Sequence, residues 1–468
     1  MLIQNNNIHK NILNISISLI PVSFIIGNLI INLNIFFILL YCLFFYRLQL
    51  FKINLSNLDK LVLIFFTYTA LVGVYNNLFN FNFPLFPDQN IVIKKSFLYL
   101  RFLFLYFIIK FLILNKVIDY KLLFYSFGLS SLFVSLDVIF QYIFGYDIFG
   151  YESSVKRLSG PFGEEKIAGS FIQRFFIFIP YTMLLFINFK KKIFLNIFLI
   201  LISIITLIGA VLSGNRIPLV MLIATFILFI CFEKEIRRNF LIIFFVFLIG
   251  FIYLAIERSF LNYHYKIFIS QGAIITKYLG NKIMTGKIIA PELCKNIDIE
   301  EDTIEYKNLN AECSKYLNVY IKEIESGIQT WQRNKFFGGG IKSFRLHCSK
   351  VDRSKMEFFV SKDGRVNCNN HPHNYYLQIA AELGIFGLLI TVALFFLIIV
   401  KSFLFIFASY NNDRNKRIFI PFFIIFFLEI FPFKTTGSFF TTSNSTFLFI
   451  ILSFVVGLLE LKKLKRNE

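Results

Sequence analysis

Long apolar segments recur through most of this 468-residue chain and constrain its fold more than any other feature. Each is about 17 to 25 residues long, the length that an α-helix needs to cross a bilayer. Hydrophobic residues make up 57% of the chain, far more than a soluble domain of this size buries. We therefore expect an all-α polytopic membrane protein with about twelve transmembrane helices. The expected spans are residues 11–30, 34–50, 59–77, 96–114, 121–143, 167–188, 193–212, 216–232, 240–257, 384–408, 417–433 and 445–461.

Charge gives the expected orientation of these spans. Lysine and arginine number 48 against 28 acidic residues, a formal net charge of +20. In a soluble protein this excess would suggest nucleic acid, but here basic residues gather in alternate short loops such as 190–192 and 462–466. The positive-inside rule places those loops in the cytoplasm. Both termini then lie on the cytoplasmic side, and we expect membrane lipids but no nucleic acid as partners.

One connection, residues 258–372, is far longer than the others and falls on the side opposite the basic loops. Within it, residues 311–337 carry apolar side chains at helical spacing and end at three glycines, Gly338 to Gly340. This pattern predicts an amphipathic helix followed by a turn, in a large and mainly helical loop. The expected division is spans one to nine (1–257), the loop domain (258–372), and an interfacial helix with the last three spans (373–468).

Four of the six cysteines lie in this loop domain: Cys294, Cys313, Cys348 and Cys368. Outside the cytoplasm, two disulfides are the expected outcome. We favour Cys348–Cys368, which would anchor the loop just before the histidines at 371 and 373, and by elimination Cys294–Cys313. Zinc is the alternative, but the close Cys-x-x-Cys pairs of structural zinc sites are missing.

His371 and His373 lie where the polar loop meets the tenth apolar segment. Pro372 suits the first turn of a helix, so we expect His373 and Asn374 at a helix N-terminus. The helix dipole favours an anion there and favours the neutral form of an imidazole. A neutral imidazole is what a general base needs, and a lipid-linked phosphate is an anion found at that depth. The alternative is that both histidines are only polar residues at a helix start.

Two other stretches place arginine at the edge of an apolar segment. The short turn 213–216 reads Ser-Gly-Asn-Arg, and Arg216 at the start of a helix can contact phosphate through two donors. Its alternative role is snorkelling to lipid headgroups. The loop 157–170 begins with Arg157 and is dense in turn formers, so a structural turn is the alternative there. Arg174 follows inside a span, where a charge must face a partner or a polar cavity.

The glycine-rich stretch 335–345 could form a backbone nest that binds an anion, with Lys342 and Arg345 as side-chain donors. It lacks the preceding strand and the Gly-Lys-Ser/Thr ending of a nucleotide-binding loop. It is also expected outside the cytoplasm, whereas a nucleotide-binding loop lies in the cytoplasm. The simpler interpretation is a tight turn after a helix, with a possible phosphate contact from Arg345.

Taken together, these motifs resemble the O-antigen ligase and polymerase superfamily of bacterial envelope enzymes. In the ligase branch, a His-Asn pair, nine residues, Gly, two residues and Gly close the large periplasmic loop. Here His373 and Asn374 are followed by the nine residues 375–383, then Gly384 and Gly387.

The weaker motifs fit the same superfamily. Residues 336–344 resemble its Pro-Leu/Ile-x-Gly-x-Gly-x-x-x-Phe turn, with Lys335 in place of the usual Pro, and 213–216 resembles its Ser-Gly-x-Arg. Residues 157–171 resemble an Arg-x-Ser-Gly-x-Phe-Gly loop of some members. One departure concerns the loop helix, where ligases usually carry an arginine. Residues 320–331 contain none, and we name Arg333 and Arg345 as candidates to replace it.

The resemblance implies an inverting glycosyltransferase of the bacterial inner (cytoplasmic) membrane, with its active site facing the periplasm. It would transfer a glycan from undecaprenyl pyrophosphate to a sugar hydroxyl of the lipid A core. His373 would be the general base, and Arg216 and Arg345 would hold the pyrophosphate. Substrate-binding roles are also expected for Asn374, Arg157 and Lys342. Fixed arginines can do what a divalent ion would otherwise do, so we expect no metal and no cofactor.

Three other functions remain open. An O-antigen polymerase or a protein O-oligosaccharyltransferase would use the same donor with a different acceptor. A transporter of lipid-linked sugars belongs to a different class and would show charges through the spans and an internal repeat. We find few such charges and no repeat, and a large disulfide-bearing loop is unnecessary for transport.

Overall fold

A computed structural model describes residues 7–79, 90–152, 157–188, 191–257, 319–348, 370–408, 414–434 and 437–467. Every regular element in these ranges is helical, as the apolar segments predict. The α-helices are α1 (Asn7–Ser18), α2 (Ile20–Ile26), α3 (Asn28–Tyr46), α4 (Asn57–Phe79), α5 (Ile91–Tyr99), α6 (Arg101–Leu114), α7 (Tyr120–Phe144), α8 (Ala168–Phe175), α9 (Phe178–Phe186), α10 (Lys192–Leu212), α11 (Arg216–Phe232), α12 (Arg237–Glu257), α15 (Val319–Arg333), α16 (Phe344–His347), α17 (Tyr375–Ala408), α18 (Arg414–Glu429) and α19 (Thr442–Asn467).

The expected polytopic membrane class is confirmed by the length and composition of these helices. Within the described ranges, 8 helices are long and apolar enough to cross a membrane, or up to 9 if the bent pair α1 and α2 forms one span. Two expected spans are single runs of two helices each, α5 with α6 and α8 with α9. All twelve expected segments coincide largely with helix, but the number twelve stays a prediction, because α11 is a shorter apolar helix and α12 and α18 are not among the eight.

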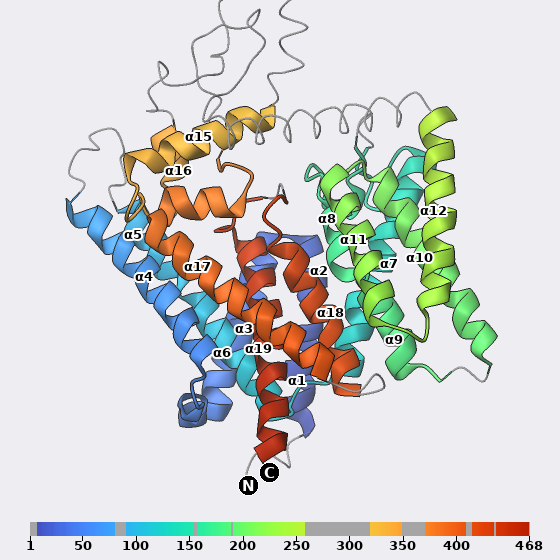
Figure 1. The fold of residues 1–468 in the computed structure, drawn as a ribbon, viewed down its shortest axis with the longest axis horizontal. Helices are drawn as coiled ribbons and strands as arrows, with labels where there is room; N and C mark the ends of the chain where they lie inside the picture. Colours follow the sequence, from blue (N-terminus) through green and yellow to red (C-terminus); the bar gives the residue numbers. More distant parts are fainter. Residues whose placement is uncertain are drawn as a thin grey trace, which may run out of the picture.

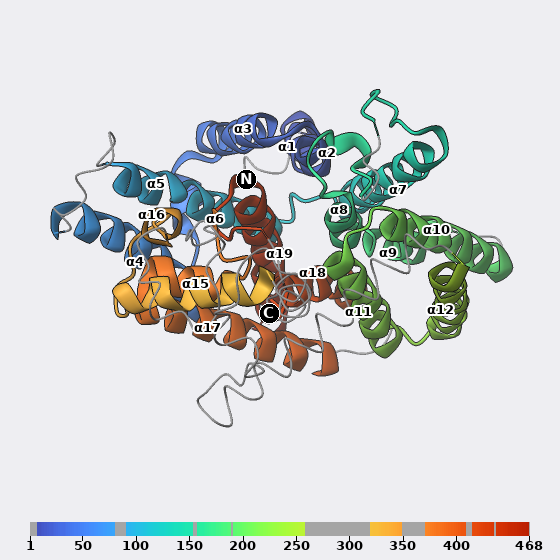
Figure 2. The same cartoon turned by 90° about the horizontal axis from the view of Figure 1, so that it is seen from above.

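The helices form one bundle with α15 and α16 lying across one end (Figure 1). α1 begins and α19 ends at the opposite end, in keeping with the expectation that both termini share one side (Figure 1). Seen from the α15 end, α19 runs through the middle of the bundle (Figure 2). Phenylalanine rings fill much of the core, as in the stacked pair Phe422 and Phe454, whose centroids are 4.3 Å apart.

Helix α17 breaks at Gly384, where the backbone adopts φ 69° and ψ −172°. The glycine-rich turn after α15 lies against this break. Gly339 N donates to the Ala381 carbonyl at 3.2 Å and Gly340 N to the Glu382 carbonyl at 2.7 Å. These bonds satisfy backbone groups that the interrupted helix leaves without partners. The turn therefore holds the short first part of α17, which follows the two histidines, in place.

Candidate functional site

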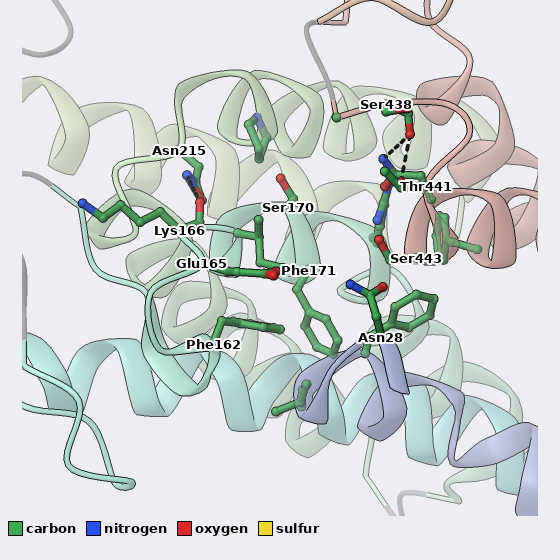
Figure 3. A pocket seen from close by; sticks show the side chains of 18 of the residues that line it. Asn28, Phe162, Glu165, Lys166, Ser170, Phe171, Asn215, Ser438, Thr441 and Ser443 are labelled. Atoms are coloured by element: carbon green, nitrogen blue, oxygen red, sulfur yellow. Dashed lines mark hydrogen bonds between the residues drawn. The ribbon is translucent and has the colours of Figure 1, made fainter. Parts of the chain in front are cut away.

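A cavity of about 620 Å³ lies at the end of the bundle that carries α15, and parts of the chain far apart in sequence line it. The helix α2–α3 junction, the loop before α8, the start of α11, the two histidines before α17 and the turn before α19 all contribute. Figure 3 shows Asn215 and Lys166 on one side of it and Ser438, Thr441 and Ser443 on the other. The cavity is thus a product of the tertiary fold rather than of one motif.

Several helices begin at the cavity. Asn28 starts α3 and Arg216 starts α11, Ser443 lies in the first turn of α19, and Ile167 directly precedes α8. Each N-terminus presents backbone N–H groups without partners in the helix and the positive end of its dipole. Such ends favour a bound anion, and several of them facing one cavity reinforce one another.

The charged side chains of the wall are mostly basic. Among the described residues, five lysines and arginines and one glutamate line the cavity: Arg157, Lys166, Arg174, Arg216, Lys434 and Glu165. The wall therefore carries an excess of positive charge, of the kind that attracts phosphate groups. Apolar side chains such as Phe24, Ile25 and Phe171 line other parts of the cavity wall.

A buried ion cluster fixes two of these cations. Arg174 donates to both oxygens of Glu429, with Nε at 3.1 Å and a terminal nitrogen at 2.6 Å. Lys434 Nζ donates to the same carboxylate at 2.7 Å, and the Tyr375 hydroxyl also donates to it at 2.7 Å. Burial lowers the pKa of the Lys434 ammonium, and Glu429 opposes that shift. One carboxylate thus balances two cations and leaves a net positive charge at the cavity.

Arg174 also donates to Asn444 Oδ1 at 2.8 Å and lies 4.5 Å from the centre of the Phe447 ring. We expected a charge at this place in a span to face a partner or a polar cavity, and Arg174 does both. These contacts fix the orientation of the Arg174 guanidinium, so that it does not have to reorient when a ligand binds.

Two sequence motifs meet in one wall of the cavity. Asn215, the residue before Arg216, accepts a hydrogen bond from Gly169 N at 3.0 Å and donates to the Lys166 carbonyl at 2.9 Å. A Cβ on Gly169 would lie 2.5 Å from Ser213 Oγ, so only glycine fits there. The Ser-Gly-Asn-Arg turn is therefore fastened to the loop 157–170, and Arg157 and Arg216 line the same cavity.

His371 and His373 both line the cavity, with ring centroids 4.2 Å apart. His373 has a positive φ of 49°, which is uncommon for a residue with a side chain. Such backbone strain is found most often at functional sites, where the surrounding structure enforces it. The His373 side chain is 37% exposed, and its Nε2 lies 3.5 Å from Glu323 Oε1 of α15. The histidine can therefore be reached from the cavity while its far nitrogen faces a carboxylate.

Asn374 lies at the start of α17, as expected, but away from the cavity lining. Its Oδ1 accepts hydrogen bonds from Tyr376 N at 2.9 Å and Leu377 N at 3.1 Å, while its amide donates to the Pro432 carbonyl at 2.7 Å. Asn374 thus caps the N-terminus of α17, which explains an amide side chain directly after His373 without a substrate contact.

The glycine-rich turn does hold a carboxyl group, but this group belongs to the protein itself. Lys342, with φ 69°, donates its backbone N–H to Glu382 Oε2 at 2.8 Å, and Glu382 is fully buried. Burial lowers the pKa of the Lys342 ammonium. Neither Lys342 nor Arg345 lines the cavity, and neither does Arg333. Besides Arg157 and Arg216, the cations that line the cavity are Lys166, Arg174 and Lys434.

The cysteines are only partly described. Cys348 is buried and disulfide-bonded, in keeping with the expected disulfides. Cys294, Cys313 and Cys368 lie outside the described residues, so both pairings stay predictions. Cys42 and Cys231 are free. In the described part of the chain, no group of three or more His, Cys, Asp or Glu side chains is placed to hold a metal ion.

Comparison with known families bears on the same residues. Residues 198–392 match a family model described as O-antigen ligase. This match supports the resemblance of the chain to the O-antigen ligase superfamily. The match includes Arg216, His371 and His373 of this O-antigen ligase-like chain, whereas Arg174 and Lys434 fall outside it. No curated protein matches the chain. Members of that superfamily are membrane glycosyltransferase-like ligases and polymerases. The apolar helices of this chain make it a multi-pass membrane protein as well.

Sequence reasoning missed Lys434, Glu429 and Glu323 as parts of this site. A signal was present for Glu429, because an acidic residue in an apolar segment requires a partner. Glu323 lies in the amphipathic stretch 311–337, where nothing local distinguishes it from a solvent-facing acid.

Proposed function

We propose that this protein transfers a glycan from undecaprenyl pyrophosphate to a sugar hydroxyl of the lipid A core, at the periplasmic face of the bacterial inner membrane. The observation that carries the proposal is the cavity itself. His373, which has a positive φ, lines this cavity together with an excess of cations, in a chain that matches an O-antigen ligase family model over residues 198–392. A base beside a diphosphate-binding surface is the arrangement that this reaction requires.

In the proposed reaction, His373 takes the proton of the acceptor hydroxyl as its oxygen attacks the anomeric carbon. The bond between that carbon and the pyrophosphate oxygen breaks, and undecaprenyl pyrophosphate leaves with the bonding electron pair. A single displacement of this kind inverts the configuration at the anomeric carbon. The cations that line the cavity stabilise the charge of the leaving group, namely Arg157, Arg174, Arg216 and Lys434.

The size and lining of the cavity suit such a donor. About 620 Å³ lies within the range of roughly 300 to 1,000 Å³ typical of small-ligand sites, enough for a diphosphate with the first sugars. The apolar part of the wall, including Ile25 and Phe171, offers a surface to the first isoprene units. Longer parts of the glycan would extend out of the cavity.

The lipopolysaccharide banding pattern of a deletion strain tests the proposal. A ligase predicts lipid A core without polymer and long polymer retained on the lipid carrier. Core capped with a single repeat would indicate a polymerase, and loss of glycan from a protein would indicate a protein transferase. Unchanged lipopolysaccharide and protein glycosylation would contradict all of these transferase functions.

A further inference from the structure

Glu323 contacts His373, a residue that lines the cavity, but does not itself line the cavity. It lies in α15, is 4% exposed, and its Oε1 is 3.5 Å from His373 Nε2. A buried acid is uncommon unless it is paired, and this one faces an imidazole 50 positions further along the chain. Its contact is therefore with the proposed base and not with a ligand in the cavity.

Close packing of α15 on the histidine turn holds this contact. Gly327 lies one helical turn after Glu323, and a Cβ there would be 3.2 Å from Pro372 Cβ and 3.5 Å from Leu377 Cβ. Glycine thus lets α15 approach the turn that carries His371 and His373. Since Glu323 and Gly327 are four residues apart, they lie on the same face of the helix. The packing that seats α15 also presents the carboxylate to the imidazole.

The charges around His373 show why the carboxylate of Glu323 would help the imidazole to take up a proton. In the described part of the chain, Glu323 of α15 and His371 of the same turn lie beside His373. The other charged groups that line the cavity with it are Glu165, Lys166, Arg157, Arg174, Arg216 and Lys434. When His373 takes a proton, it adds one more positive charge to a wall that already has an excess. Nearby like charges disfavour that step, and an adjacent carboxylate favours it.

We infer that Glu323 is a positioning residue for His373: it fixes the ring with Nε2 toward α15 and offsets the charge that the imidazole gains. This inference rests on the proposed function. The proton moves from the acceptor hydroxyl to His373 Nδ1, on the side of the ring away from α15, while Glu323 stays ionised. α15 also ends at an arginine, Arg333, but that residue does not line the cavity.

The test uses the full-length protein in detergent with selectively labelled histidine, and a transfer assay in cells. NMR follows the pH titration of His373, whose signal is identified by its loss in His373→Asn. The variants are Glu323→Gln, which keeps the shape and removes the charge, and Glu323→Asp, which restores the charge. Gln332→Ala, an exposed position of α15, is the matched control.

We expect Glu323→Gln to move the His373 titration to lower pH and to lower transfer on the order of ten- to a hundredfold. Glu323→Asp should recover part of both changes, and Gln332→Ala should change neither. An unmoved titration in Glu323→Gln would overturn the inference even if transfer fell, because the residue would then serve only to seat α15. Wild-type transfer by His373→Ala would instead refute the proposed function, whatever the titration shows.

Discussion

Arg174 and Glu429, 255 positions apart in the chain, meet in the cavity wall through two hydrogen bonds of 3.1 and 2.6 Å. The pair joins α8 to the end of α18, and Lys434 shares the same carboxylate. Charges buried in a membrane protein are costly and mark functional positions by default. The single negative charge of Glu429 faces the two positive charges of Arg174 and Lys434, so the cluster keeps a net positive charge beside the cavity.

Removing this carboxylate should destabilise the fold strongly. In Glu429→Gln, Arg174 and Lys434 stay buried without a countercharge, which costs about 3 to 5 kcal/mol when one partner of a buried pair is lost. Thermal unfolding in detergent measures the effect. Glu235→Gln is the control, because Glu235 is 44% exposed in its pair with Arg417 and should matter little. Equal melting temperatures for the two variants would contradict this account of the cluster.

Alanine at Gly384 should prevent correct folding of α17. Its Cβ would lie 2.1 Å from the Phe336 carbonyl oxygen, and its φ of 69° disfavours any side chain. The backbone contact cannot relax without moving the glycine-rich turn away from the break. Gly150→Ala is the matched control, since its φ is 87° but nothing lies within 4 Å of the added Cβ. We expect little folded protein from Gly384→Ala by size-exclusion chromatography, and near-normal yield from the control. Similar yields would disprove the close approach.

Stability should fall as the pH rises from about 5 to 7.5, in part because of Glu233. This residue lies between α11 and α12, and burial raises its pKa to about 7, although Arg417 opposes the shift. A raised pKa means that the folded state holds the proton more tightly than the unfolded state does. The resulting stabilisation is complete below the unfolded pKa and is lost as the pH rises through the folded one.

Glu233→Gln keeps the shape of the side chain and removes its titration. The melting temperature of the wild type should therefore fall more steeply across this pH window than that of the variant. The loss of stabilisation from Glu233 across this pH window amounts to at most about 3 kcal/mol in the free energy of unfolding. Parallel curves for the two proteins would show that Glu233 titrates normally.

Transfer activity should persist in a chelator. Arg157, Arg174, Arg216 and Lys434 line the cavity and can stabilise a departing diphosphate without a divalent ion. Membrane preparations assayed with and without EDTA should transfer glycan at the same rate. A loss of activity that Mg²⁺ or Mn²⁺ restores would show that the cations of the protein are insufficient.

The fold class follows from the sequence because apolar length is a local property, and each expected span can be judged by itself. Partners that are distant in sequence cannot be read from a local pattern, and this explains why some expected site residues do not line the cavity. The turn around Lys342 has the chemistry expected of an anion site, but the group that it binds is the carboxyl group of Glu382, 40 positions away. Asn374 could serve a substrate or a helix equally well, and its hydrogen bonds serve the helix. Lys434 resembles an ordinary loop lysine until α18 and α8 come together.

The residues that were both expected at the site and found in the cavity are His373, Arg216 and Arg157. Each lies next to turn formers at the edge of an apolar segment, so sequence alone restricts where it can be. The positive φ of His373 adds information that the sequence pattern does not contain, because it is seen only in the folded structure.

The most direct test of the central claim is glycan transfer by His373→Ala in a deletion strain, with expression verified and His9→Ala as the control. His9 lies in α1 and forms a hydrogen bond with Tyr41, away from the cavity. Loss of a general base should lower transfer about a hundred- to ten-thousandfold, and the control should leave it unchanged. Transfer at the wild-type level by His373→Ala would contradict the account.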